Sequence, residues 1–244
     1  MAAPRYVLTA GVPTVSTGFA SLDKALGIGG LPRGKIVEIF GPASCGKTAL
    51  ALQIAASLQR GGGAAAWIDA DHCFDPGFAS ELGVDLSRLP VAAPDSTEAA
   101  GEMACRLAGS GVLELIVIDS AAALIPQAEL DSDLALTASG LYSRALGSVL
   151  RRMATAAARC QACILVVNQL RIRQEGQGQP ETSAGGPPLK LYAAVRVALA
   201  AAGRKVRFRI VKNSLAAPFT TGVLHWRPAD PSGSGLGAGF VEPL

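Results

Sequence analysis

The sequence has few of the residues that mark a metal site, a disulfide framework or a membrane span. Its 244 residues include five cysteines, two histidines and only 5% aromatic residues. The cysteines are odd in number and irregularly spaced, which excludes a disulfide framework and favours a reducing compartment. Cys160 and Cys163 have C-x-x-C spacing, but without a second pair we expect core thiols rather than a zinc site.

Long apolar runs are also absent. No stretch approaches the length that crosses a membrane, and the first residues, MAAPRYVLTAGVP, lack the apolar segment of a signal peptide. We therefore expect a cytoplasmic protein with no membrane partner. Its core must be filled by Ala, Val, Leu and Ile, because aromatic residues are scarce.

Charge is distributed unevenly along the chain. Residues 140–212 contain 13 Lys and Arg against two acids, a net charge of +11, while the whole chain carries only +3. This asymmetry indicates an anionic partner for the second half of the chain, such as a nucleic acid. A solvated basic face is the alternative.

The most informative stretch joins a short strand to a helix. Ile36, Val37, Ile39 and Phe40 form a short apolar, largely β-branched run, and residues 48–60 have helical character up to three glycines. The pattern G-x-x-x-x-G-K-T between them is that of a phosphate-binding loop, whose backbone N–H groups cradle an anion at a helix N-terminus. Its residues are Gly41, Pro42, Ala43, Ser44, Cys45, Gly46, Lys47 and Thr48. Lys47 would reach the β- and γ-phosphates of a nucleotide, and the Thr48 hydroxyl would hold Mg²⁺.

Strands and helices alternate along the rest of the chain. Beyond the first strand, further strands are expected at 64–69, 89–93, 113–120 and 162–168, and helices at 76–82, 96–108 and up to about 159. This order predicts an α/β fold with a mostly parallel central sheet and helices on both faces. Two alternating segments around Ala202 and Gly203 predict an antiparallel extension near the C-terminus. We expect a short extension over 1–14, a core over 15–228 and a flexible tail over 229–244.

Polar residues stand where three of these strands end. Asp119 follows an apolar strand, where it would reach the water shell of Mg²⁺, although capping the next segment is an alternative role. Asp69 and Asp71 end a neighbouring strand, so at least one of them could orient an attacking water. Gln169 follows another strand and could pass the state of a γ-phosphate into the polar loop 171–186.

Several runs together resemble the bacterial RecA recombinases. They are VSTGFASLDKALGIGGLPRGKIVEIFGPASCGKTAL, WIDADHCFDP, LIVIDS, VNQLRIR, PETSAGG and IVKNSLAAPF, in the order of that family and over residues 15 to 225. The resemblance implies a RecA-like P-loop NTPase core with ATP and Mg²⁺ as cofactors. It also implies an ATPase that binds single-stranded DNA through two loops, polymerises on it and pairs homologous strands.

The resemblance also implies roles for single residues at the nucleotide. Gly41–Thr48 would bind the phosphates, and Thr48 and Asp119 would hold the metal. Asp75 and Phe78 stand where the family contacts adenine by a hydrogen bond and by ring stacking, with Phe78 at a position that is usually tyrosine. The residues implied in catalysis are Asp71, Lys47, Gln169 and Lys212, of which Lys212 would reach the nucleotide of a neighbouring subunit.

DNA contacts are implied for two loops and their basic flanks. Loop 131–139 with Arg144 and Arg151 matches the first, and loop 171–186 with Arg171 and Arg173 matches the second. The implied partners are single-stranded DNA, duplex DNA as a further candidate, and other copies of the chain in an oligomer or short filament.

The sequence departs from the family at several positions. Asp71 replaces the catalytic glutamate and is one methylene shorter, Ser214 replaces a second interface lysine, and loop 171–186 lacks an aromatic residue. We also expect no docking helix before residue 15 and no further domain after about 228. Two functions stay open: a DNA-dependent ATPase that acts as a recombinase, and a RecA-like accessory protein of repair or lesion bypass that hydrolyses ATP little.

Overall fold

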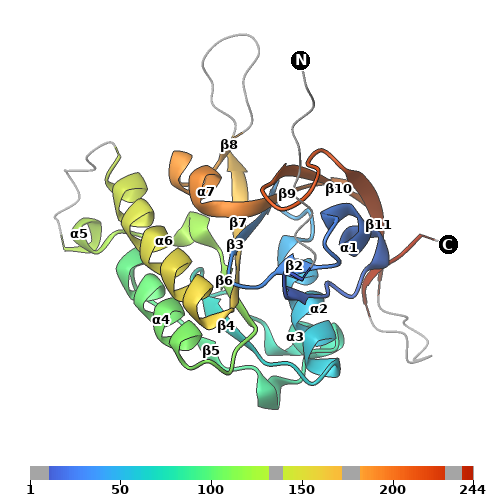
Figure 1. The fold of residues 1–244 in the computed structure, drawn as a ribbon, viewed down its shortest axis with the longest axis horizontal. Coiled ribbons are helices and arrows are strands. Elements are labelled where there is room, and N and C mark those ends of the chain that lie inside the picture. Colours follow the sequence, from blue (N-terminus) through green and yellow to red (C-terminus); the bar gives the residue numbers. More distant parts are fainter. Residues whose placement is uncertain (1–10, 132–139, 172–181, 229–237, 244) are drawn as a thin grey trace, which may run out of the picture.

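The computed structural model of the chain describes residues 11–131, 140–171, 182–228 and 238–243. Its main feature is one sheet with the strand order β12-β11-β10-β9-β3-β7-β6-β4-β5, with β8 paired to β7 (Figure 1). The bounds of its strands are β3 Ile36–Gly41, β4 Ala65–Asp69, β5 Val91–Ala92, β6 Leu115–Asp119, β7 Cys163–Arg171, β8 Thr182–Ser183, β9 Ala193–Ala202, β10 Lys205–Asn213, β11 Thr221–Arg227 and β12 Gly239–Val241. A separate antiparallel pair joins β1, Thr14–Val15, to β2, Leu31–Pro32.

Six of the strands are parallel and form the middle and one side of the sheet. β3 pairs in parallel with both β7 and β9, and the parallel order continues through β6 and β4 to β5. Every residue of β3, β4 and β6 is buried. These strands read as nearly continuous apolar runs because both of their faces are covered.

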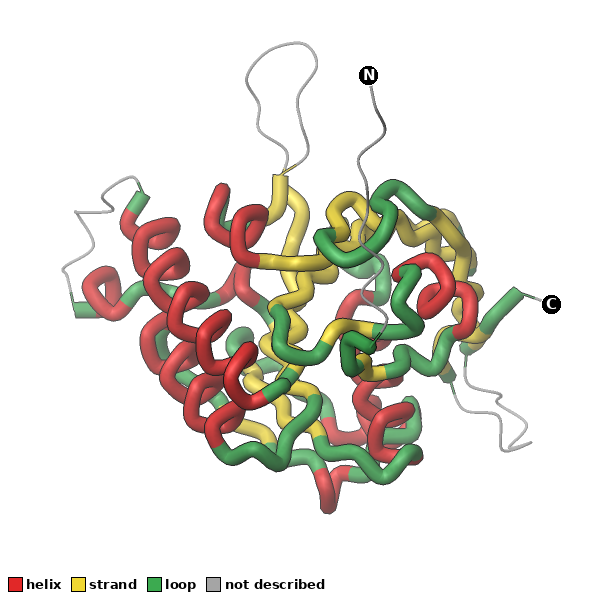
Figure 2. Tube along the Cα trace, in the orientation of Figure 1, coloured by secondary structure: helices red, strands yellow, loops and turns green. Residues whose placement is uncertain are grey.

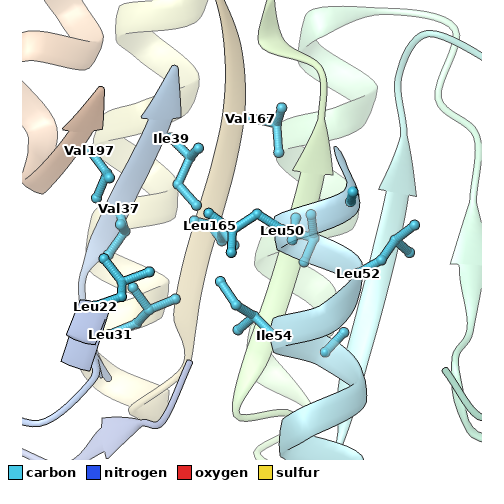
Figure 3. Close-up of a cluster of buried hydrophobic side chains, with 14 of the residues drawn as sticks. Leu22, Leu31, Val37, Ile39, Leu50, Leu52, Ile54, Leu165, Val167 and Val197 are labelled. Atoms are coloured by element: carbon cyan, nitrogen blue, oxygen red, sulfur yellow. The ribbon is translucent and has the colours of Figure 1, made fainter. Parts of the chain in front are cut away.

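Helices cover both faces, as the alternation of strands and helices predicted (Figures 1 and 2). Their bounds are α1 Ala20–Leu26, α2 Lys47–Arg60, α3 Pro76–Glu81, α4 Thr97–Gly109, α5 Gln127–Leu130, α6 Leu141–Cys160 and α7 Pro187–Tyr192, with single 3-10 turns η1 Leu86–Arg88 and η2 Ala121–Ala123. One core includes residues of α1, α2 and α3, and the other residues of α4, α6 and α7. Figure 3 shows the first core, where Leu50 and Ile54 of α2 lie beside Leu165 of β7.

The antiparallel extension alternates instead. In β10, Val206, Phe208 and Ile210 are buried while the basic residues between them are exposed. β10 pairs antiparallel with β9 and with β11, which confirms the predicted hairpin around Ala202 and Gly203. The predicted fold class, an α/β core with a mostly parallel sheet and an antiparallel extension, is therefore confirmed.

The last residues differ from the flexible tail expected over 229–244. Gly239–Val241 form β12, which pairs antiparallel with β11, and Phe240 is buried. This strand was not predicted because it has only three residues, too few to show the period of two of a strand, and because it follows a polar and glycine-rich run. Residues 229–237, like 132–139 and 172–181 of the two expected DNA loops, lie outside the described residues. None of the described helices has both the length and the apolar character that a membrane crossing requires.

Candidate nucleotide site

The phosphate-binding loop connects β3 to α2, as predicted. Gly46 precedes α2 with a left-handed φ of 88°, and Ser44 also has a positive φ of 57°. Gly41 needs to be glycine for a different reason, since a Cβ there would lie 2.5 Å from the carbonyl oxygen of Leu199. The loop is thus a close-packed turn at a helix N-terminus, where backbone N–H groups can bind an anion.

Lys47 is the first residue of α2 and lies against the loop. Its Nζ donates a hydrogen bond to the Pro42 carbonyl at 2.6 Å and lies 3.9 Å from Cys45 Sγ, and only 9% of the residue is exposed. Burial raises the pKa of the Cys45 thiol, and the nearby Lys47 charge opposes that shift. The ammonium group is held on the inner side of the loop, where a bound phosphate would replace the Pro42 oxygen as its partner.

Thr48 and Asp119 meet at the same edge of the sheet. The Thr48 hydroxyl donates a hydrogen bond to Asp119 Oδ2 at 2.7 Å, so α2 and the end of β6 are in contact. Asp119 is buried, and burial raises its pKa to about 6, while the Thr48 hydrogen bond and the Lys47 charge lower it and Asp71 raises it. Ser120, not Asp119, stands at the start of the following turn η2. A hydroxyl and a carboxylate side by side are the oxygen ligands that Mg²⁺ takes in nucleotide sites, so these residues fit the metal.

Asp69 and Asp71 differ in their surroundings. Asp69 ends β4 and its carboxylate accepts hydrogen bonds from the backbone N–H groups of Cys73 and Phe74, both at 3.1 Å. Asp71 is half-buried, and burial followed by its interactions with Asp69 raises its pKa. Both line a small cavity of about 60 Å³ together with Thr48 and Asp119. Asp69 is buried and engaged in the turn, whereas Asp71 is the more exposed of the two carboxylates.

The two residues expected at adenine, Asp75 and Phe78, both line the small cavity that Asp71 and Asp119 also line. Asp75 is exposed and caps α3 by accepting a hydrogen bond from Phe78 N at 3.1 Å. Phe78 also lines a larger cavity of about 390 Å³ beside the phosphate loop. The lining of this cavity also includes Trp226 of β11 and Phe240 of β12, which we did not predict from the sequence. Trp226 is one of only two tryptophans, and this rarity was the only signal for it.

Gln169 lies next to the phosphate loop. It is exposed near the end of β7, where it is the ladder partner of Gly41, the first residue of the loop. Its carbonyl accepts a hydrogen bond from Ala184 N at 2.9 Å, and Leu170 pairs with Ser183 in β8. The strands that carry the segment 172–181 therefore begin and end beside the nucleotide site.

A buried polar network connects the strands next to Gln169, and we did not predict it from the sequence. Glu38 of β3 is fully buried, and its carboxylate accepts a hydrogen bond from Asn168 at 2.9 Å and forms an ion pair with Arg196 at 2.5 Å. Arg196 also donates to Ser183 Oγ at 3.1 Å, and Asn168 donates to the Ala184 carbonyl at 2.9 Å. The network joins the strand before the phosphate loop to both strands at the base of segment 172–181.

Lys212 lies apart from the phosphate loop of its own subunit. Its Nζ donates hydrogen bonds to the carbonyls of Lys190 and Leu191 at 2.8 and 3.1 Å. Burial, and next the charge of Arg196, lower the pKa of Lys212. The residue lines a separate cavity of about 350 Å³ with Ser214, so its role toward a neighbouring subunit stays a prediction.

The arginines expected at DNA are only partly described. Arg144 and Arg151 are exposed on α6 and, seven residues apart, share one face of that helix. Arg171 ends β7, and Arg173 lies outside the described residues. The structure thus places two of the four on one helix and a third at the start of the segment 172–181.

The fold and this site define a P-loop NTPase core. The family model of the RecA N-terminal domain matches residues 7–226. Proteins named Protein RecA are similar over most of the chain: that of Chlamydia felis is 42% identical over 91% of this chain and 67% of its own length, and that of Rubrobacter xylanophilus is 45% identical over 95% and 71%. That of Leifsonia xyli subsp. xyli is 46% identical over 85% of this chain and 61% of its own length.

The chain belongs to the RecA family. Membership supports an ATP-dependent role in recombination and DNA repair. The chain spans about two thirds of the length of the relatives it matches, so their full activities come to it only as proposals.

Proposed function

We propose that this chain binds ATP with Mg²⁺ and single-stranded DNA, hydrolyses ATP in response to DNA, and acts in strand pairing. The observation that carries the proposal is the contact between Thr48 and Asp119 at 2.7 Å, next to a phosphate-binding loop over which Lys47 is already folded. These groups come from β3, α2 and β6, and they meet where a nucleoside triphosphate and its metal would lie.

Each residue has a separate task in this proposal. Lys47 compensates the charge of the β- and γ-phosphates, and the loop N–H groups orient them. Thr48 and Asp119 hold Mg²⁺, which when bound neutralises charge that develops on the phosphate oxygens. Asp71 orients the attacking water and accepts its proton, since it is more exposed than Asp69, which is buried and accepts two backbone hydrogen bonds in the turn. Phe78 supports the base.

Coupling to DNA is supported by the position of Gln169. Gln169 is exposed and pairs with Gly41 in the sheet, and the strands on either side of segment 172–181 share the buried network of Glu38, Asn168 and Arg196. A change in the position of Gln169 on contact with a γ-phosphate would therefore be passed to both ends of that segment.

DNA is the proposed anionic partner of the basic segment 140–212. Its net charge of +11 suits a phosphate backbone, and Arg144, Arg151, Arg171 and Arg173 are the proposed contacts, with duplex DNA as a second ligand. We further propose that copies of the chain assemble into an oligomer or short filament on DNA in the cytoplasm, with Lys212 acting on the neighbouring nucleotide.

A second candidate is a RecA-like accessory protein that binds ATP and DNA or a repair partner with little hydrolysis. It is favoured by Asp71, whose carboxylate is one methylene shorter than glutamate, and by Lys212, which is tied to the backbone of its own subunit.

The ATPase rate with and without single-stranded DNA separates the two candidates. A recombinase should hydrolyse ATP faster when DNA is added, and Lys47→Ala should remove that rate. A basal rate that DNA leaves unchanged, with ATP still bound, would favour the accessory protein.

A further inference from the structure

The last described strand lies directly against the nucleotide site. β12 pairs with β11 so that Phe240 is opposite Trp226. β12 also contacts α2, the helix that begins with Lys47 of the phosphate-binding loop. Phe240 is only 4% exposed and belongs to the core that contains α2. Phe240 and its strand are therefore part of the domain core.

A single side chain of α2 fastens this strand. Gln53 Oε1 accepts a hydrogen bond from Phe240 N at 2.7 Å, and Gln53 Nε2 donates one to the Phe240 carbonyl at 3.2 Å. The amide thus satisfies both backbone groups of Phe240 on the side away from β11. Close by, Glu242 Oε1 accepts a hydrogen bond from Ser21 N at 2.9 Å, which ties the next residues to the start of α1.

The Phe240 ring touches the phosphate-binding loop. A Cβ added at Gly46 would lie 2.4 Å from the tip of this ring, so the ring occupies the space that the missing side chain leaves free. Trp226 packs edge-on against Phe240 with ring centroids 5.2 Å apart, and Phe78 lies 6.5 Å from Trp226. All three rings line the cavity of about 390 Å³ whose other wall is the loop itself.

We propose that Gln53 and Phe240 are positioning residues of the nucleotide site. The segment Gly239–Glu242 holds the phosphate-binding loop and the aromatic wall at a fixed separation, so nucleotide binding requires that this segment is docked. Rings of this kind offer flat apolar surface to a base, while the loop opposite takes the phosphates. The inference rests on the proposed binding of a nucleotide by the phosphate loop.

The same helix supplies a matched control. Gln59 of α2 also makes two amide hydrogen bonds to one backbone residue, donating to the Asp85 carbonyl at 3.0 Å and accepting from Asp85 N at 2.9 Å. Asp85 lies outside the cavity lining, and Gln59 is the more buried of the two glutamines. Gln59→Ala thus removes the same type of contact and should destabilise the fold at least as much as Gln53→Ala, but it leaves the residues that line the cavity unchanged.

The test is the affinity for ATP and ADP of Gln53→Ala, Phe240→Ala and Gln59→Ala in the full chain. We expect the first two to weaken both affinities by about fivefold or more, with a larger change in KM for ATP than in kcat, and Gln59→Ala to stay within about twofold. Equal losses in Gln53→Ala and Gln59→Ala, or no loss in Gln53→Ala, would overturn the proposal.

A spectroscopic readout separates this proposal from the one it rests on. In a Trp67→Phe background Trp226 is the only tryptophan, so its fluorescence reports the aromatic wall. We expect ADP to change this fluorescence, and Phe240→Ala to reduce the change at saturating ADP. If the unaltered chain binds no nucleotide, the proposed function fails. If it binds nucleotide and Trp226 fluorescence stays constant, only the positioning role fails.

Discussion

The parallel and antiparallel parts of the sheet contribute differently to the site. Parallel strands β3, β6 and β4 are buried throughout; β6 and β4 end in the acids Asp119 and Asp69, and β3 carries the buried Glu38 and ends at Gly41. The antiparallel strands β10 and β11 are exposed on one face and contribute apolar groups, including Trp226, to the cavity. The phosphate-binding loop therefore belongs to the parallel part, while Trp226 and Phe240 of the cavity beside it belong to the extension.

This difference explains why the parallel part of the site is easier to predict from a sequence than the antiparallel part. Strand ends in a parallel sheet meet at one edge, so residues placed at those ends come together whatever the intervening helices contain. The aromatic wall depends instead on the register of β11 with β12, which pairs Trp226 with Phe240.

The largest effect on activity should come from removing the loop charge. Lys47→Ala should reduce ATP hydrolysis by at least about 100-fold, because no other described ammonium group lies at the loop and a transition-state contact of this kind is worth about 3 kcal/mol. Steady-state hydrolysis assays measure this. Lys35→Ala, at the exposed position before β3, is the control and should retain the parental rate.

Breaking the buried network should mostly affect stability. Arg196→Met leaves the fully buried Glu38 without its ion-pair partner and should cost about 3–5 kcal/mol in the free energy of unfolding. Urea denaturation measures it, and Arg106→Ala, which breaks the exposed pair with Glu102, should have little effect. Equal losses in the free energy of unfolding in the two variants would contradict a larger contribution from the buried Glu38 pair.

Changes at Asp71 test the assignment of the catalytic carboxylate. Asp71→Asn should retain ATP binding and lose turnover, because an amide cannot accept the proton of the attacking water. Asp71→Glu, which restores the reach of the family's glutamate, should hydrolyse ATP faster than the parent. A Glu variant no faster than the parent would argue that Asp69 carries the role or that the site has readjusted.

The smallest effect is a pH dependence from Asp119. Burial raises its pKa to about 6 in the folded chain, above the value of 3.8 expected in the unfolded chain. As the pH rises, the unfolded state loses this proton before the folded state does. The free energy of unfolding of the nucleotide-free protein should therefore fall by on the order of 1–3 kcal/mol as the pH rises from about 4 to about 6. Thermal unfolding at pH 5 and 7 measures it. Asp119→Asn should remove this dependence and be more stable than the parent at pH 7.

Much of the fold and of the phosphate end was predictable from local patterns. The loop Gly41–Thr48 and the acid at the end of β6 follow from strand, turn and helix signals within a few residues. The Glu38 pair did not follow, although a carboxylate within the run IVEIF indicates that a partner is needed. That partner, Arg196, is 158 residues away. Long-range pairing of this kind has no local signal in a single sequence.

The central claim is that an ATP site at one edge of the sheet controls binding of DNA through the basic second half of the chain. Affinity for single-stranded DNA, measured with ATP, with ADP and without nucleotide over a range of salt concentrations, tests it most directly. The expected result is tight binding only with ATP, with weak sequence preference and an affinity that falls steeply as salt rises. Equal affinity without nucleotide, or an affinity independent of salt, would contradict it.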